Sequence, residues 1–112
     1  MMAVKNVSDL IAEYFSKNDI GVVFGIIGAG NAQIFDAIHR YGKTKIICVH
    51  HEQAAVMAAM SYYRITNKPT VVLLTTGAGS SNAITGVLSA WMDSIPVIIL
   101  SGNENSKYTK KN

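Results

Sequence analysis

The sequence predicts an α/β fold: a parallel sheet of at least four strands with helices on both of its faces, a three-layer sandwich. Two features carry this prediction. Short apolar runs alternate with segments of helical spacing from one end of the chain to the other. These runs are continuous, whereas strands of a half-exposed antiparallel sheet alternate apolar and polar residues. With 112 residues, the chain is long enough for one compact domain and too short for two.

The first half of the chain is expected to begin with a helix and to continue as strand, helix and strand. Asn6 or Ser8 is suited to cap the opening helix, and Asn18 with Gly21 marks its end. The apolar residues at helical spacing in it are Leu10, Ile11, Tyr14 and Phe15. The segments expected to follow are a strand at 22–25, a helix at 32–41 and a strand at 45–49.

The second half repeats the alternation. We expect a helix at 52–66, a strand at 70–75, a helix at 81–93 and a strand at 97–100. In parallel sheets of this kind, ligands bind beyond the carboxyl ends of the strands. The segments at those ends are 25–31, 50–52, 75–82 and 101–103. Functional residues are therefore expected in these segments.

The charge of the chain is concentrated at its C-terminal end. The formal net charge is +3, and residues 103–112 contribute +2 of it, with three lysines against one glutamate. Because the rest of the chain is nearly neutral, we expect no nucleic-acid partner. We expect residues 1–102 to form an incomplete α/β domain. Residues 103–112 are expected to form a polar basic tail or the start of a linker.

The cysteine content and the N-terminal segment indicate the compartment. Cys48 is the only cysteine and lies in an apolar run, which predicts a buried free thiol in a reducing compartment. Lys5, Asp9 and Glu13 interrupt the apolar stretch that a signal peptide would need, and no apolar run approaches membrane-spanning length. We therefore expect a cytoplasmic protein with no membrane partner.

Two glycine-rich segments follow predicted strands and approach the dinucleotide-binding fingerprint G-x-G-x-x-G/A. From Gly28 the chain reads G-A-G-N-A-Q, and from Gly77 it reads G-A-G-S-S-N. Gln33 and Asn82 therefore stand where the fingerprint needs a small residue. Glu52 follows at about the spacing of the ribose-binding acid, but it opens a helix, whereas that acid normally ends a strand. Dinucleotide binding stays an alternative that the motif does not favour.

The residues before the third predicted helix also have simple interpretations. His50 and His51 are adjacent, so in a regular strand their side chains point to opposite faces and do not readily share a metal ion. We expect no metal site in the chain. A glutamate at a helix N-terminus, such as Glu52, stabilises the helix dipole without needing any further role.

A wider pattern favours a specific function for Glu52. The chain reads HEQAA after the second predicted strand, then YYRITNKPTVVLLTTGAGSSNAITGVLSAWMDSIPVIILSGN. It combines one glutamate after the second strand, a G-x-G-x-x-N loop after the third, and D-S-x-P before the fourth. In this combination the chain resembles the N-terminal pyrimidine-binding domain of thiamine-diphosphate enzymes, nearest to the acetolactate synthase, pyruvate oxidase and benzoylformate decarboxylase group. The resemblance runs from the leading helix through VVFGIIGAGN to SGN and implies a flavodoxin-like arrangement.

The resemblance assigns roles to five residues. It implies that Glu52 is catalytic and hydrogen-bonds N1′ of the aminopyrimidine of thiamine diphosphate, activating the cofactor. Ile27 and Gly28 would lie near that ring. Thr75 and Asn82 match family positions that face the cofactor or substrate cleft, although a strand-end threonine and a helix-capping asparagine are equally simple interpretations. Mg²⁺ and the diphosphate would be held by a domain outside this chain, and FAD is possible in the parent enzyme.

The resemblance also implies an activity and a partner. The parent enzyme would be a lyase or transferase, a decarboxylase or carboligase acting on an α-keto acid, and a homodimer or homotetramer. In the family that the chain resembles, the site is shared with the diphosphate-binding domain of another subunit. The chain itself has no G-D-G…N segment, by which that family binds magnesium and the diphosphate. The chain alone would then lack turnover. A non-catalytic remnant or interaction module is the alternative. Thr75 stands where some decarboxylases of this group carry histidine, which weighs against a benzoylformate-type decarboxylase. Ile27 and Asn103 also differ from residues common in relatives, and these two differences leave the donor and acceptor substrates open.

Overall fold

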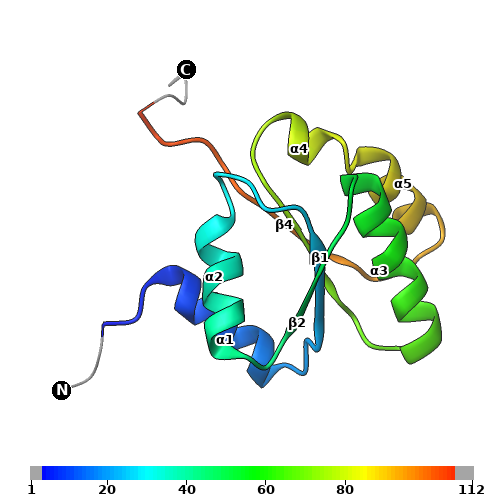
Figure 1. Ribbon diagram of the computed structural model, residues 1–112. Coiled ribbons are helices and arrows are strands. Elements are labelled where there is room, and N and C mark those ends of the chain that lie inside the picture. The colour runs from blue at the N-terminus through cyan, green and yellow to red at the C-terminus, as the bar shows by residue number, and fades with distance from the viewer. Residues whose placement is uncertain (1–3, 108–112) are drawn as a thin grey trace.

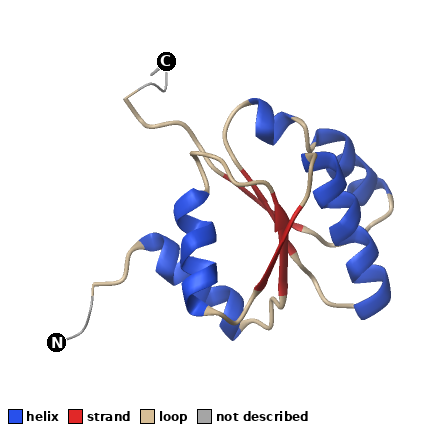
Figure 2. Cartoon of the chain, viewed as in Figure 1, coloured by secondary structure: helices blue, strands red, loops and turns tan. Residues whose placement is uncertain are grey.

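The chain folds as an α/β sandwich in a computed structural model, which describes residues 4–107. A parallel sheet lies between two groups of helices (Figure 2). Its four strands, in spatial order, are β2 (Lys45–Cys48), β1 (Val22–Gly25), β3 (Val71–Leu74) and β4 (Ile98–Ser101). The predicted parallel sheet and three-layer arrangement are confirmed. The order 2-1-3-4 is that of the first strands of a flavodoxin-like sheet, and it differs from the usual dinucleotide-binding order.

The helices cover the two faces of the sheet separately (Figure 1). Helices α1 (Val7–Lys17) and α2 (Ala32–Tyr41) lie on one face, and α3 (Glu52–Thr66) and α5 (Ile84–Met92) lie on the other. The short helix α4 (Ala78–Ser81) precedes α5. All these elements except α4 fall within a few residues of the segments that apolar spacing predicts.

Side chains of the central strands alternate between two hydrophobic cores. Val23 and Leu73 pack toward α1 and α2, whereas Phe24, Val72 and Leu74 pack toward α3 and α5. Every residue of β1 and β3 is buried, which explains why these strands read as continuous apolar runs. The sheet is therefore rigid at its centre, where both glycine-rich loops begin.

The edge strands correct one expectation. Strands β2 and β4 are only partly buried, because each pairs with a single neighbour and its outer side is open. Cys48, the last residue of β2, is exposed, so the predicted buried thiol is wrong. The apolar run that contains Cys48 indicated a strand correctly, but it held no information about which strand lies at the edge.

The ends of helix α1 agree with the capping signals in the sequence. Some of its apolar residues at helical spacing are nevertheless exposed. Asn6 caps α1 in a capping box with Asp9, and the helix stops at Lys17. Of the four apolar residues at helical spacing, Leu10 and Tyr14 are more than half exposed. Phe15 is buried in the core together with Ala12, and Ile11 is partly buried against it.

The predicted helix at 81–93 is also wrong in its bounds. Helical structure starts earlier, at Ala78, stops at Ser81, and resumes at Ile84. The serine and asparagine side chains at the break bond elsewhere: Ser80 Oγ donates to Thr75 O, and Asn82 Nδ2 donates to Glu52. Such side chains compete with helical hydrogen bonds. The break directs Asn82 toward the start of α3.

Within residues 4–107, no helix is long and apolar enough to cross a membrane. The lysines at 110 and 111, on which the expected basic tail partly rests, lie outside the described residues.

Candidate functional site

The candidate site lies where the loops after β1 and β3 meet the start of α3. Gly30 N donates a hydrogen bond of 3.2 Å to Thr75 Oγ1, which joins the two loops. Gly102, just after β4, packs directly on the backbone of Gly30. These segments lie at the carboxyl ends of the strands. They are next to the β1–β3 pair, where the strand order reverses: β2 lies on one side of β1, and β3 and β4 lie on the other. In sheets of this type, this is the position of the ligand.

Glu52 is the charged centre of this cluster. It is the first residue of α3, and only 7% of its surface is exposed. Asn82 Nδ2 donates to Glu52 Oε2 at 3.1 Å. The other oxygen, Oε1, accepts no hydrogen bond from the described residues, and none of their side-chain oxygens is both fully enclosed and unpartnered. Oε1 therefore keeps contact with the space outside the protein while Oε2 is held.

The N-terminus of α3 places this carboxylate. His51 is the N-cap, with an extended backbone, and its Nδ1 accepts a hydrogen bond of 3.1 Å from Gln53 N. The free N–H groups of the first turn favour a negative charge there. His51 thus acts as a cap, and residues 4–107 contain no group of three or more His, Cys, Asp or Glu that could hold a metal ion.

The loop after β1 is held by a buried asparagine. Asn31 is 1% exposed; its Oδ1 accepts from Gly28 N at 2.8 Å, and its Nδ2 donates to Ile26 O at 3.0 Å. Both ends of the short loop are thereby tied to one side chain. No motif in the sequence singles out Asn31; the available signal is its position just before α2, where asparagine is a common cap, yet its side chain caps no helix.

Thr75 lies between the two glycine-rich loops. A Cβ at Gly28 would come within 2.4 Å of Thr75 Oγ1, and a Cβ at Gly79 within 2.5 Å of Thr75 Cγ2. The same Gly79 Cβ would lie 3.3 Å from Glu52 Oε1. The contact chain Gly28, Thr75, Gly79 and Glu52 therefore connects segments that are far apart in the sequence.

The predicted site residues are thus brought together with one exception. Gly28, Thr75, Glu52 and Asn82 form one connected cluster. Ile27 is 57% exposed and lines a separate hollow with residues of α2, including Phe35 and Asp36. Gly79 and Asn31 belong to the cluster although neither was predicted individually.

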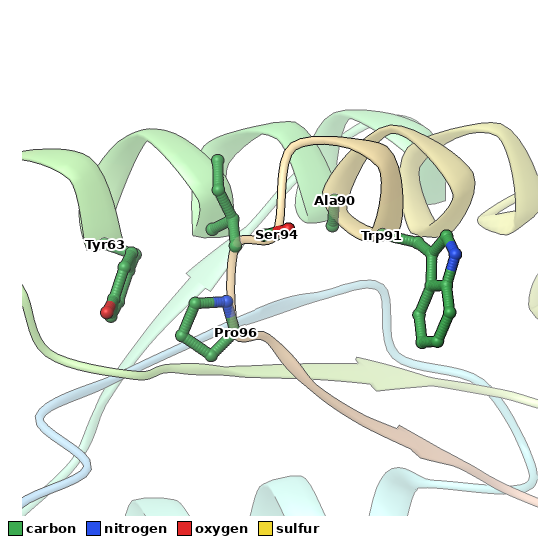
Figure 3. A pocket seen from close by; sticks show the side chains of 6 residues that line it. Tyr63, Ala90, Trp91, Ser94 and Pro96 are labelled. Carbon is green, nitrogen blue, oxygen red and sulfur yellow. The ribbon is translucent and has the colours of Figure 1, made fainter.

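A hollow on the described surface lies away from this cluster (Figure 3). It has a volume of about 660 Å³ and lies between α3, α5 and the start of β4, with Tyr63, Trp91 and Pro96 among its lining residues. Tyr63 is in the last turn of α3 and Pro96 precedes β4, so the hollow lies at the amino ends of the strands. It is at the opposite end of the sheet from Glu52, which opens α3.

Comparison with known proteins identifies the family of the chain. Residues 5–112 match the family described as thiamine pyrophosphate enzyme, N-terminal TPP binding domain. The acetolactate synthase large subunit of Haemophilus influenzae is 43% identical over 95 residues, which are 85% of this chain and 17% of that protein. The isozyme 3 large subunit of Escherichia coli K12 is 41% identical over 95 residues, again 85% and 17%.

A eukaryotic relative is similar over a comparable range. The mitochondrial acetolactate synthase of Schizosaccharomyces pombe is 39% identical over 98 residues, which are 88% of this chain and 15% of that protein. The chain therefore spans between 15% and 17% of the length of these three relatives. The chain belongs to the family of N-terminal TPP binding domains of thiamine pyrophosphate enzymes, and its homologues are acetolactate synthase large subunits.

Proposed function

We propose that this chain activates thiamine diphosphate in an acetolactate-synthase-like enzyme that acts on an α-keto acid, and that Glu52 is the catalytic residue. The observation that carries the proposal is the state of the Glu52 carboxylate. It is buried at a helix N-terminus, Asn82 holds Oε2, and Oε1 has no hydrogen-bond partner among the described residues. An oxygen in this state is suited to a ring nitrogen that carries or receives a proton.

The surrounding residues fit a flat aminopyrimidine ring. Gly79 leaves space beside Oε1 that a larger residue would fill. Within the described chain, the hydrogen bonds of this cluster are made by Asn, Thr, Ser, Glu and backbone groups. No cation takes part in them, which favours a ligand edge without phosphate at this point. The diphosphate and Mg²⁺ would accordingly be held by another domain.

The chain's own residues then have distinct tasks. When bound, thiamine diphosphate supplies the electron sink for decarboxylation and carbon–carbon bond formation. Oε1 of Glu52 holds or transfers a proton at N1′ of the ring. Asn82 fixes the rotation of the carboxylate by donating to Oε2, so that Oε1 is the oxygen left for this proton. A ring bound against Oε1 would exclude bulk water from the same oxygen.

The substitution Glu52→Gln tests this assignment. In the assembled enzyme, this chain is combined with a diphosphate-binding domain in the same polypeptide or as a separate subunit. There, we expect exchange of the cofactor's C2 proton to slow by about 10²–10⁴-fold, the usual range for losing a proton-transfer group. The exchange rate of the C2 proton is measured by hydrogen–deuterium exchange followed by NMR. The control is Glu13→Gln, the same chemical change on α1. Unchanged exchange in Glu52→Gln would show that Glu52 has no such role.

The proposal extends to partners of the chain. The site would be completed by the diphosphate-binding domain of another subunit, in a homodimer or homotetramer located in the cytoplasm, with FAD possible in the parent enzyme. Calorimetry with thiamine diphosphate and Mg²⁺ should then show weak binding to this chain alone and tight binding once the second domain is added. Tight binding to the chain alone would contradict the shared site. No binding in either case would favour a non-catalytic remnant or interaction module.

A further inference from the structure

Gly79 occupies a confined position between two functional side chains. It is the second residue of α4, and its backbone does not require glycine, because the positive-φ glycines of the described chain are Gly42 and Gly77. The constraint is space. A Cβ at Gly79 would come within 2.5 Å of the Thr75 methyl and within 3.3 Å of Glu52 Oε1. One of these neighbours would have to move to accept any larger residue.

Thr75 is poorly able to move. Its Oγ1 accepts the hydrogen bond from Gly30 N, so rotation about χ1 would break the link between the two loops. Its side chain also lies against Gly28 on the other side. A β-branched residue has few alternative rotamers in any case. The main chain is held as well, because the hydroxyl group of Ser80 donates to Thr75 O.

Glu52 Oε1 is the neighbour with freedom to move. The carboxylate is held at Oε2 alone, by Asn82. A methyl group at position 79 would therefore be pushed away from the fixed Thr75 methyl and toward Oε1. It would occupy the space from which a ligand approaches that oxygen.

We propose that Thr75 and Gly79 form a size-matched pair that keeps Oε1 of Glu52 open to the edge of a flat, nitrogen-containing ring. Thr75 is a positioning residue in this arrangement, acting through Gly79 and the loop after β1. This inference rests on the function proposed for Glu52. It adds that access to Oε1 is set by the methyl group of Thr75, which follows β3, whereas Glu52 follows β2.

A double-mutant cycle tests the pair. Gly79→Ala introduces the clash, and Thr75→Ser removes the methyl group while it keeps the hydroxyl that Gly30 N needs. Gly79→Ala should lower the Tm of the chain by several degrees, at least about 4 °C, as overpacking does. In the assembled enzyme it should slow C2 proton exchange by roughly 100-fold, the order expected when a reacting group is displaced by about 1 Å. The double variant should recover most of both losses relative to Gly79→Ala.

Gly28→Ala is the matched control. Its Cβ would meet Thr75 Oγ1 at 2.4 Å and Thr75 Cβ at 2.7 Å, and Thr75→Ser leaves both atoms in place. Thr75→Ser should therefore fail to rescue Gly28→Ala while it rescues Gly79→Ala.

Two results would overturn the inference: a Gly79→Ala variant with unchanged Tm and exchange, or a double variant no better than Gly79→Ala. The Tm cycle does not involve the cofactor and so tests the pair even if the proposed function is wrong. An absence of C2 exchange in the unmodified assembled enzyme would instead overturn the proposed function, and with it the role of Oε1.

Discussion

Asn31 lies beneath the loop that follows β1 and bonds to that loop's backbone at two points. Its Oδ1 accepts from Gly28 N, and its Nδ2 donates to Ile26 O. Both backbone groups belong to the loop that contains Gly30, whose N–H donates to Thr75. The position of one side of the candidate site therefore depends on a side chain that is itself almost completely buried.

Asn31→Ala should destabilise the chain through this loop. The substitution leaves an N–H and a carbonyl without their partner, and an unsatisfied buried polar group costs about 1–3 kcal/mol. We expect the free energy of unfolding to fall by about 2 kcal/mol or more, measured by urea denaturation. Asn103→Ala, at an exposed asparagine, is the control and should stay within about 0.5 kcal/mol. A loss as small as that of the control would mean that the loop holds its shape without Asn31.

Individual site residues differ in how far the sequence predicts them. Glu52 is accessible from sequence, because it opens a helix directly after a strand and sits in a wider family pattern. The roles of Gly79, which belongs to the G-x-G-x-x-N motif, and of Asn31 are not, because they arise from distances to Thr75, Glu52 and backbone atoms that only the folded chain brings together. When two residues in contact are tens of residues apart in the sequence, no short-range spacing pattern reveals their contact.

At the scale of elements, α1 carries a network of surface ion pairs. Glu13 pairs with Lys5 at 2.7 Å and with Lys17 at 2.8 Å, and Asp9 pairs with Arg40 of α2 at 2.8 Å. The hydrogen bonds from Lys17 and then Lys5 lower the pKa of Glu13 from 4.5 to about 2. All these groups are near solvent, where ion pairs are screened and contribute little individually.

This pKa shift predicts a specific pH dependence for Glu13→Gln. Because the folded pKa is below the unfolded one, the unfolded chain binds more protons as the pH falls from 4.5 toward 2. The stability that Glu13 contributes is present above pH 4.5 and is lost through that window. The Tm difference between the unmodified chain and Glu13→Gln should therefore shrink as the pH is lowered. It should also shrink in 1 M salt, where the Debye length is about 3 Å. A difference independent of pH and salt would contradict the ion pairs.

Strands were easier to predict than the helical segment after β3. The four apolar runs locate the strands to within about a residue at each end. The break between α4 and α5 depends on Ser80 and Asn82 finding partners in Thr75 and Glu52, and the exposure of Cys48 depends on β2 being an edge strand. Neither these side-chain contacts nor the strand order is encoded by an apolar run.

At the scale of the whole molecule, one side of the described chain is unusually apolar. Helix α5 has no charged residue, and its buried positions are small, Gly86 and Ala90. Its larger side chains point outward instead: Ile84, Leu88, Trp91 and Met92 are all more than half exposed. Ile99 of the edge strand β4 lines a hollow together with Trp91. We call Ile84, Leu88, Trp91, Met92 and Ile99 the α5 face.

The α5 face should make the isolated chain self-associate. Large exposed apolar patches favour association, because burying them removes apolar surface from water. Sedimentation velocity over a concentration series should show a rising average mass, and Leu88→Glu combined with Trp91→Glu should abolish the rise. Both side chains are exposed, so the double variant should fold like the original, which far-UV circular dichroism checks. The control is Ile65→Glu, at an 85% exposed residue of α3 outside the α5 face, and it should leave association unchanged. If the unmodified chain stays monomeric at every concentration, or if the double variant associates equally, the α5 face does not drive contacts between copies.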